Sequence, residues 1–456
     1  MNASESTSAA PAVPRLRRVL GVWDLVLYGI VAVTPSAPVT VFGIAMRDSK
    51  GHAIDTILIA MVAMILTAVS YGRMAALYPS AGSAYTYVGR GLNPHLGFLA
   101  GWAMLLDYLF IPLFCVIYGT VSFQRLVPEI PYVISTALFA GAMTFANLRG
   151  IRTTARTSEI MVGGMMIVLL TFIALAVRRL FADGGMAAVI STTPFYNPAT
   201  FELKSIATAT SFAALTYLGF DSVTTLAEDV RNPKRNVMLA AVGVCVFTGL
   251  FGGLLTYLAQ LAWPDFNTFT NVETAFMDVT KRVGGPLLFS AMAILLVVAN
   301  VGAGLTSQVG AARLLFGMGR DNVFPRRFFA HLSEKRNTPT YNIWLIGIVA
   351  FVGAQFMTVE ITGELLNFGA FLGFMGVNLA VVWQFFVRKP QGRRRNLFGD
   401  LLVPGLGFIF CFLIWIYLSN IAKTAGGLWF VIGLVYLAFR TKGFREKPAM
   451  IDFSEA

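Results

Sequence analysis

Charged residues are scarce in this sequence. Over 456 residues only 13% are Asp, Glu, Lys or Arg, whereas soluble globular proteins have roughly 25%. Hydrophobic residues make up 56%, and 38 residues are Phe. Apolar runs of about 18 residues or more recur along the chain, each long enough to cross roughly 30 Å of hydrocarbon. This composition excludes a soluble globular domain and predicts a polytopic membrane protein.

Cysteine and histidine are scarce as well. The three cysteines fall inside apolar runs, where they behave as small apolar residues, and the three histidines lie far apart. No disulfide framework, metal-ligand spacing or catalytic constellation is visible, so we expect no cofactor and no enzymatic activity. These six residues are Cys115, Cys245, Cys411, His52, His95 and His331.

The apolar runs predict an all-α fold with about twelve membrane helices. The expected spans are 23–46, 54–77, 95–122, 131–147, 159–181, 204–228, 237–262, 285–312, 342–358, 364–387, 400–418 and 425–440.

The basic residues predict the orientation. If the N-terminus is cytoplasmic, 26 of the 35 Lys and Arg fall in cytoplasmic segments, as the positive-inside rule requires. Both termini are therefore expected in the cytoplasm, with residues 1–20 and 441–456 as tails and the first of them disordered. The net charge of +12 reflects topology, and we expect the lipid bilayer but no nucleic acid as a partner. The oligomeric state is left open.

Two of the spans are interrupted. Pro35 and Pro38 lack a backbone donor, so the first helix cannot continue normally between Ala32 and Val39. Carbonyls before this break and N–H groups after it are freed. The second half-helix should begin near Ser36, where its N-terminus suits a carboxylate.

The sixth span has its weak point at Gly219, between Tyr217 and Asp221. Each break has an ordinary structural alternative. The first could be a packing helix kinked by proline, and the second a glycine that lets two helices cross closely. The offset of five spans between them instead predicts inverted repeats at 21–182 and 203–390, followed by two further helices at 398–440, with a substrate between the breaks.

Several segments resemble a known group. Gly219-Phe-Asp-Ser222 and the run from Glu228 to Asn236 are similar to the sixth-helix signature of the amino acid-polyamine-organocation superfamily. Segments 81–87, 93–98, 105–110 and 313–325 resemble its bacterial putrescine-importer branch. The resemblance implies a leucine-transporter-like fold of five plus five helices. It also implies a permease in the bacterial inner membrane that works by ion-coupled alternating access.

Acids inside membrane spans are costly, so they are candidates for function. Asp221 lies in the second break, where the resemblance implies a role in amine binding or proton coupling; it could also cap the half-helix that follows. Asp107 must face the interior, where it could contact an amine, carry a proton or form a structural hydrogen bond. Glu228 and Asp229 are expected at the cytoplasmic end, solvated or part of a gate.

The expected substrate site combines both breaks with the third span. Tyr217 and Phe220 qualify by position and Tyr108 by its neighbour, whereas the aliphatic Leu215 argues against a cation-stacking wall. The complete set is Val33, Thr34, Ser36, Ala37, Thr40, Asp107, Tyr108, Ala213, Leu215, Tyr217, Gly219 and Asp221.

The substrate class is less sharply indicated. Thr40 stands where the putrescine-type sequences have an acid, and a diamine needs acceptors for two cationic ends. We therefore favour, narrowly, a zwitterionic amino acid or related amine over putrescine or another polyamine. A non-transporting nutrient sensor or a channel is the alternative of another class.

The coupling ion is left open between H⁺ and Na⁺. The fifth span has no lysine to replace sodium, and Ala303, Thr306 and Ser307 resemble a sodium site completed by carbonyls near the first break. Such hydroxyls more commonly bond back to their own helix. Proton coupling through Asp107 or Asp221, and exchange or facilitated diffusion without a coupling ion, are the alternatives.

Overall fold

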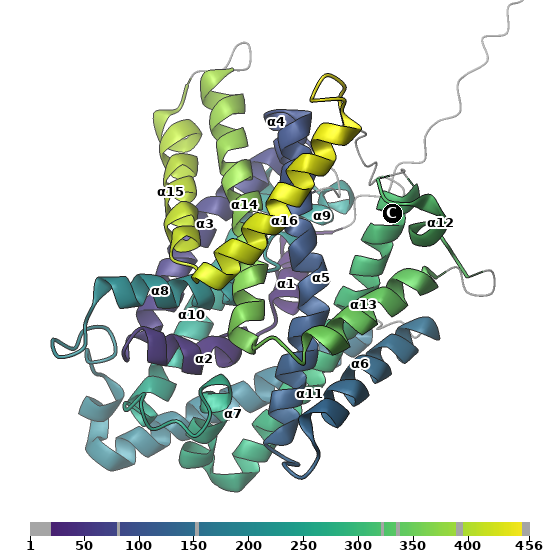
Figure 1. Cartoon of the computed structure of the whole chain (residues 1–456). Coiled ribbons are helices and arrows are strands. Elements are labelled where there is room, and N and C mark those ends of the chain that lie inside the picture. Colours follow the sequence, from purple (N-terminus) through teal and green to yellow (C-terminus); the bar gives the residue numbers. More distant parts are fainter. Residues whose placement is uncertain are drawn as a thin grey trace, which may run out of the picture.

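The computed structural model describes residues 20–79, 83–150, 155–320, 323–333, 338–388 and 395–448, with only the backbone of 155–158. Within these ranges the helices are joined by turns and loops, and the β-type pairing is one isolated bridge between Leu20 and Val230 (Figure 1). The expected N-terminal tail, except for Leu20, and residues 449–456 of the C-terminal tail lie outside the described residues. Parts of the quoted segments 81–87 and 313–325 lie outside them too.

The helices are α1 (Val22–Val33), α2 (Ala37–Asp48), α3 (Ala53–Leu77), α4 (Ser83–Gly91), α5 (Pro94–Gln124), α6 (Tyr132–Leu148), α7 (Ala155–Val189), α8 (Leu203–Ala213), α9 (Ser222–Thr225), α10 (Pro233–Ala262), α11 (Ala275–Arg320), α12 (Arg326–Phe329), α13 (Thr340–Gly353), α14 (Val359–Val381), α15 (Val403–Ile416) and α16 (Asn420–Arg440). Short 3₁₀ segments are η1 (Ala214–Tyr217), η2 (Ala227–Asp229) and η3 (Val272–Thr274), and wider π-helical segments are η4 (Val382–Val387) and η5 (Phe398–Leu402).

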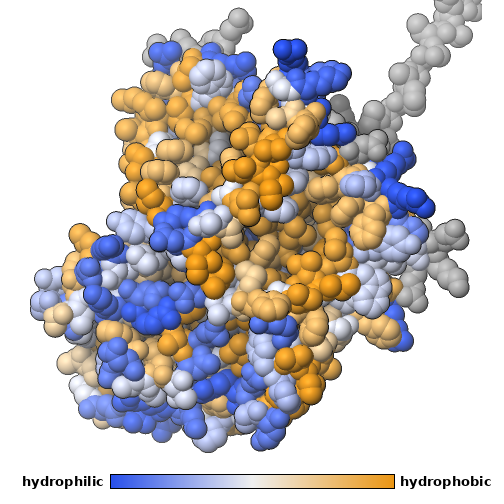
Figure 2. All heavy atoms as spheres, viewed as in Figure 1, coloured by the Kyte–Doolittle hydropathy of each residue, from blue (hydrophilic) through white to orange (hydrophobic). Residues whose placement is uncertain are grey.

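The all-α polytopic prediction is confirmed. In the described part of the chain, 8 helical segments are long and apolar enough to cross a membrane, and the bent pair α1 and α2 makes a ninth. The shorter apolar helices α6 and α13 and the interrupted segment from α8 to α9 fall on the remaining expected spans. On the face shown in Figure 2, hydrophobic side chains cover much of the surface over α13 to α16. Hydrophilic side chains gather along the top and bottom edges of this view.

Some elements differ from the expected ranges. The short helix α4 was not expected, because its nine residues are less apolar than a span. Helix α11 begins well before residue 285 and bends there, where Gly285 has a φ of 70° and Pro286 follows. Helix α7 bends in the same way at Gly184 and Gly185.

The bundle packs around buried aromatic and small side chains. Helix α10 lies along α3, and α11 and α14 lie along α5. Trp102 of α5 and Trp429 of α16 stack at 4.9 Å, and each indole N–H donates to the other residue's carbonyl at 2.9 Å. Cys115, Cys245 and Cys411 are all buried and unpaired.

Candidate functional site

The first break lies where the prolines predict it. Helix α1 ends at Val33, α2 begins at Ala37, and the two are bent by 49°. Thr34 has a φ of 63°, a value that residues other than glycine rarely adopt. In a regular helix the Val31 carbonyl would accept a hydrogen bond from the N–H of residue 35. Because Pro35 has no N–H, this bond is missing.

The first break leaves more acceptors than donors. No N–H of the described residues donates to the Ala32 carbonyl. After the break, Ala37 N–H donates to the Thr34 carbonyl at 3.1 Å and Val39 N–H to the Ser36 carbonyl at 3.0 Å. Pro38 has no N–H. At the start of α2 the N–H of Ser36 donates to no backbone carbonyl of the described residues, so it is left for the carboxylate that the helix dipole would suit, whereas those of Ala37 and Val39 are used.

The second break is longer than expected. The α-helix ends at Ala213, tightens to 3₁₀ in η1, and resumes only at Ser222. Gly219 has a φ of 99°, and a Cβ on this residue would lie 3.1 Å from the Ala32 carbonyl oxygen. The two breaks are therefore in contact, as the substrate-site hypothesis requires.

Two intramembrane acids converge beside the breaks. Asp221 accepts a hydrogen bond from Ser83 Oγ of α4 at 3.2 Å, and its side chain makes no capping bond to α9. Asp107 of α5 has a buried Oδ1 without a hydrogen-bond partner. Its carboxylate interacts electrostatically with that of Asp221. Two acids from different helices thus share one region.

Two tyrosines border this pair of acids. Tyr28 of α1 and Tyr108 of α5 both lie near Asp221. Tyr28 is 42% exposed and Tyr108 37% exposed, so both side chains extend to the surface of the helix bundle. We call the free carbonyls of the first break together with Asp107 and Asp221 the central site.

Other expected residues support the site instead of facing it. Tyr217 donates from its hydroxyl to the Ile57 carbonyl at 2.8 Å, which ties the second break to α3. Phe220 packs on Tyr71 and Phe374 in the core. Leu215 lies against α14 at Gly363.

The small polar residues of the first break make local contacts. Thr40 Oγ1 donates to the Ser36 carbonyl at 3.4 Å. Ser36 Oγ is buried and its contact is the Met165 sulfur at 4.0 Å. Ala213 is fully buried at the end of α8.

Ser83 and Tyr28 were not predicted as site residues. Ser83 lies in a segment noted only for its resemblance, and Tyr28 is one of many aromatic residues in apolar runs. Neither has a local signal, because each meets Asp221 only through the packing of helices.

The hydroxyls proposed for sodium bond within their own helix. Thr306 Oγ1 donates to the Gly302 carbonyl at 3.1 Å, and Ser307 Oγ donates to the Gly304 carbonyl at 3.2 Å. The oxygen lone pairs are not used by these bonds, so both could still accept a cation. Ala303, beside them, is half-buried.

A many-helix membrane protein whose two broken helices meet beside intramembrane acids has the architecture of a secondary transporter. The sequence profile of the amino acid permease family matches residues 25–444. The chain belongs to this family, which is part of the amino acid-polyamine-organocation superfamily.

Three relatives show the range within the family. The chain is 32% identical to the low-affinity putrescine importer PlaP of Escherichia coli, covering 94% of this chain and 95% of the relative. It is 28% identical to the methylthioribose transporter of Bacillus subtilis, with 96% of each covered. It is 24% identical to the branched-chain amino acid permease BcaP of the same organism, with 92% of each covered.

Proposed function

We propose that this permease imports a small organic amine across the bacterial cytoplasmic membrane, with the ammonium group held between Asp107, Asp221 and the carbonyls of the first break. The observation that carries the proposal is that two carboxylates, those of Asp107 and Asp221, lie in one region beside the free carbonyls of the first break. An ammonium group has only N–H donors, and charge-assisted bonds to carboxylates are its strongest. Two neighbouring carboxylates also repel each other unless one is protonated or a cation lies between them.

The same observation bears on the class of amine. A zwitterionic amino acid needs donors for its carboxylate; the N–H groups of Ala37 and Val39 are already bonded, which leaves that of Ser36 at the start of α2. Two carboxylates in one site favour a diamine over the amino acid that the sequence narrowly favoured. The similarity to a putrescine importer supports this choice, and Tyr28 and Tyr108 could add cation–π contacts.

An amino acid substrate is the second candidate. Ser36 Oγ is buried at the start of α2, and its contact is a weak acceptor, the sulfur of Met165. This hydroxyl could turn to a substrate carboxylate instead. The similarity to a branched-chain amino acid permease fits this alternative.

The proposed cycle is alternating access, with both termini in the cytoplasm. The unit of α1, α2, α3, α8, α9 and α10 would rock against α5, α6, α11 and α13. Leu20 N–H donates to the Asp229 carbonyl at 3.1 Å, and Arg231 N–H donates to the Leu20 carbonyl at 2.9 Å. These bonds join the start of α1 to the segment after α9, so the two broken helices would move together.

Substitution of the two acids tests the proposal. Asp221→Asn and Asp107→Asn should each lower putrescine uptake into proteoliposomes by roughly 30-fold or more, because removing one partner of a buried charge pair costs about 2–5 kcal/mol. The control is Asp183→Asn, an exposed acid paired with Arg179, which should transport normally.

Other outcomes would contradict the proposal. Near-normal putrescine uptake by Asp221→Asn would refute the central site. Uptake of leucine but not of putrescine by the unmodified protein would favour the second candidate. Saturable binding without flux would indicate a sensor, and unsaturated electrodiffusive flux a channel.

A further inference from the structure

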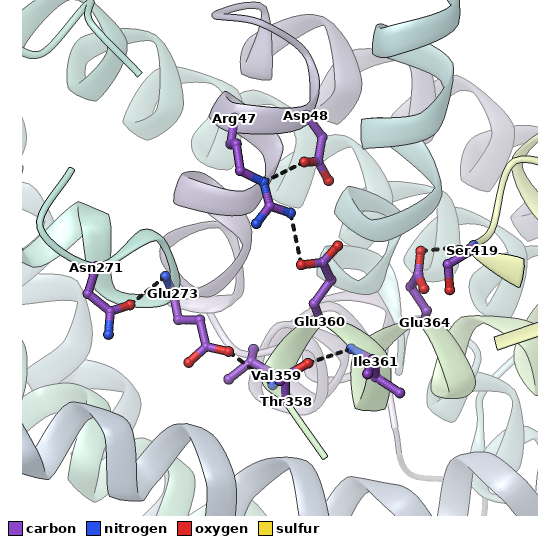
Figure 3. Close-up of polar contacts among 10 residues, drawn as sticks. All are labelled: Arg47, Asp48, Asn271, Glu273, Thr358, Val359, Glu360, Ile361, Glu364 and Ser419. Carbon is purple, nitrogen blue, oxygen red and sulfur yellow. Dashed lines mark hydrogen bonds and ion pairs between the residues drawn. The ribbon is translucent and has the colours of Figure 1, made fainter. Parts of the chain in front are cut away.

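A second charged cluster lies at the far end of α2, where α2 meets η3 and the start of α14 (Figure 3). Arg47 donates from Nε to Asp48 Oδ1 at 2.7 Å and from Nη2 to Glu360 Oε2 at 2.8 Å. Two further acids, Glu273 and Glu364, lie close by. We call Asp48, Glu273, Glu360 and Glu364 the outer acid cluster, since the expected orientation places it on the external side.

Two acids of the cluster hold helix starts. Glu273 Oε1 accepts the Val359 N–H at 3.2 Å at the start of α14. Glu364 Oε1 accepts the Ser419 N–H at 3.1 Å, just before α16. Each carboxylate uses one oxygen for this bond.

The second oxygen of Glu364 has no hydrogen-bond partner among the described residues. Glu364 is only 5% exposed, and its Oε2 is buried without a hydrogen bond. Its carboxylate interacts electrostatically with Glu360 and Asp48, and that of Glu273 with Glu360 and Arg47. In Figure 3, Glu360 and Glu364 rise side by side from the first turns of α14. A buried acceptor facing other acids is costly until a cation reaches it.

The cluster has four carboxylates for one guanidinium. We propose that it is an external binding site for an organic ammonium ion, and that Arg47 occupies this site as a tethered competitor when no substrate is there. Arg47 offers N–H donors and one positive charge, as an ammonium group does. This proposal rests on the proposed import of an amine.

Competition would link binding to opening. The ion pair between Arg47 and Glu360 connects the second half of the first broken helix to α14, which lies outside the rocking unit. An amine that replaces Arg47 at Glu360 would remove this connection. A ligand shifts a conformational equilibrium only by binding one state better, and here the state with Arg47 displaced is the better binder.

The test is putrescine binding to purified protein by calorimetry at low salt, in an Asp221→Asn background that disables the central site. In this background, Arg47→Gln should tighten the residual binding by about tenfold, equivalent to about 1.4 kcal/mol. Adding Glu364→Gln or Glu360→Gln should abolish it. A purely structural role for Arg47 predicts weaker binding, or none.

Lys50→Gln is the matched control. Lys50 pairs with Glu202 at 2.5 Å, so its replacement also removes a positive charge near the end of α2. Equal tightening by Lys50→Gln would overturn the proposal in favour of long-range attraction. Arg47→Lys, which keeps the charge, should not tighten binding, and melting temperatures identify any variant that fails to fold.

The two proposals fail in different ways. If Asp221→Asn keeps normal uptake, the central site is wrong whatever the outer acid cluster does. If Asp221→Asn loses uptake but Arg47→Gln shows no tighter residual binding, the outer site is refuted and the central site stands.

Discussion

Gly219 decides how closely the two broken helices approach each other. Its φ of 99° suits glycine, and its missing side chain leaves the Ala32 carbonyl oxygen uncovered. That oxygen is one of the free acceptors of the central site. A single residue thus both permits the second break and keeps an acceptor of the first break available.

Gly219→Ala should reduce amine uptake more than it reduces stability. A left-handed conformation costs an L-residue about 1–2 kcal/mol, and the added Cβ would press on the Ala32 carbonyl. We expect a melting temperature lower by a few degrees and uptake lower by tenfold or more, the estimate following from about 1.4 kcal/mol of lost binding.

The matched control for Gly219→Ala is Gly427→Ala on α16. A Cβ at Gly427 would meet no atom within 4 Å, so this variant should transport and melt like the unmodified protein. If Gly219→Ala transports equally well, close contact between the breaks is not needed for transport.

For single residues, the sequence identifies the charged groups of the site but not the hydrogen-bond partners of its side chains. Asp107 and Asp221 could be selected because an acid in an apolar run is costly. That Ser83 donates to Asp221, or that Tyr217 turns to α3, depends on helices distant in the sequence. The bonding of Ala37 and Val39 could not be predicted either, because it follows from the tight turn at Thr34.

Among the elements, the two breaks differ in how well they were predicted. Pro35 and Pro38 remove donors, so the first break falls where the sequence places it. The second begins at Ala214, before Gly219, and the four residues of η1 contain no proline or glycine. The change from α-helix to 3₁₀ helix in η1 occurs where this segment packs against α3 and Tyr217 bonds to it. No local sequence pattern encodes that change.

We expect the stability of the protein to depend on pH through the residue that precedes α3. His52 lies just before α3, fully buried, with Nε2 3.2 Å from Thr200 Oγ1. Burial lowers the pKa of His52 below its ordinary value of 6.5. The unfolded chain therefore binds a proton more readily, and stability should fall as the pH decreases below about 6.5.

Melting curves between pH 7.5 and 5 measure this effect, with pH values chosen around the ordinary pKa of about 6.5 for histidine. The melting temperature of His52→Gln should depend less on pH than that of the unmodified protein. His95→Gln, which replaces a half-buried histidine at the start of α5, is the matched control and should leave the dependence unchanged. An unaltered profile in His52→Gln would assign the acid sensitivity to other groups.

For the molecule as a whole, composition alone predicted the class. Low charge and recurring apolar runs require a polytopic membrane protein, and the helices fall on the expected spans. The pairing of the helices as inverted repeats and the cytoplasmic position of the termini remain predictions. Both depend on relations across the bilayer that no single segment encodes.

The driving ion is a property of the whole cycle. We expect putrescine uptake into proteoliposomes to follow an imposed proton gradient and to persist when sodium is replaced by potassium, because the intramembrane carboxylates Asp107 and Asp221 can carry a proton. Thr306→Ala combined with Ser307→Ala should then transport normally. Uptake that requires sodium and is lost in this double variant would instead support the sodium site.

The three buried cysteines have a practical consequence for watching the bundle move. Because Cys115, Cys245 and Cys411 are enclosed by side chains, thiol reagents should reach them slowly in the folded protein. Probe pairs attached to new surface cysteines on α2 and α14 would therefore report on distance without removal of the native thiols. The native cysteines should therefore add little label to spectroscopic measurements of how the bundle opens and closes.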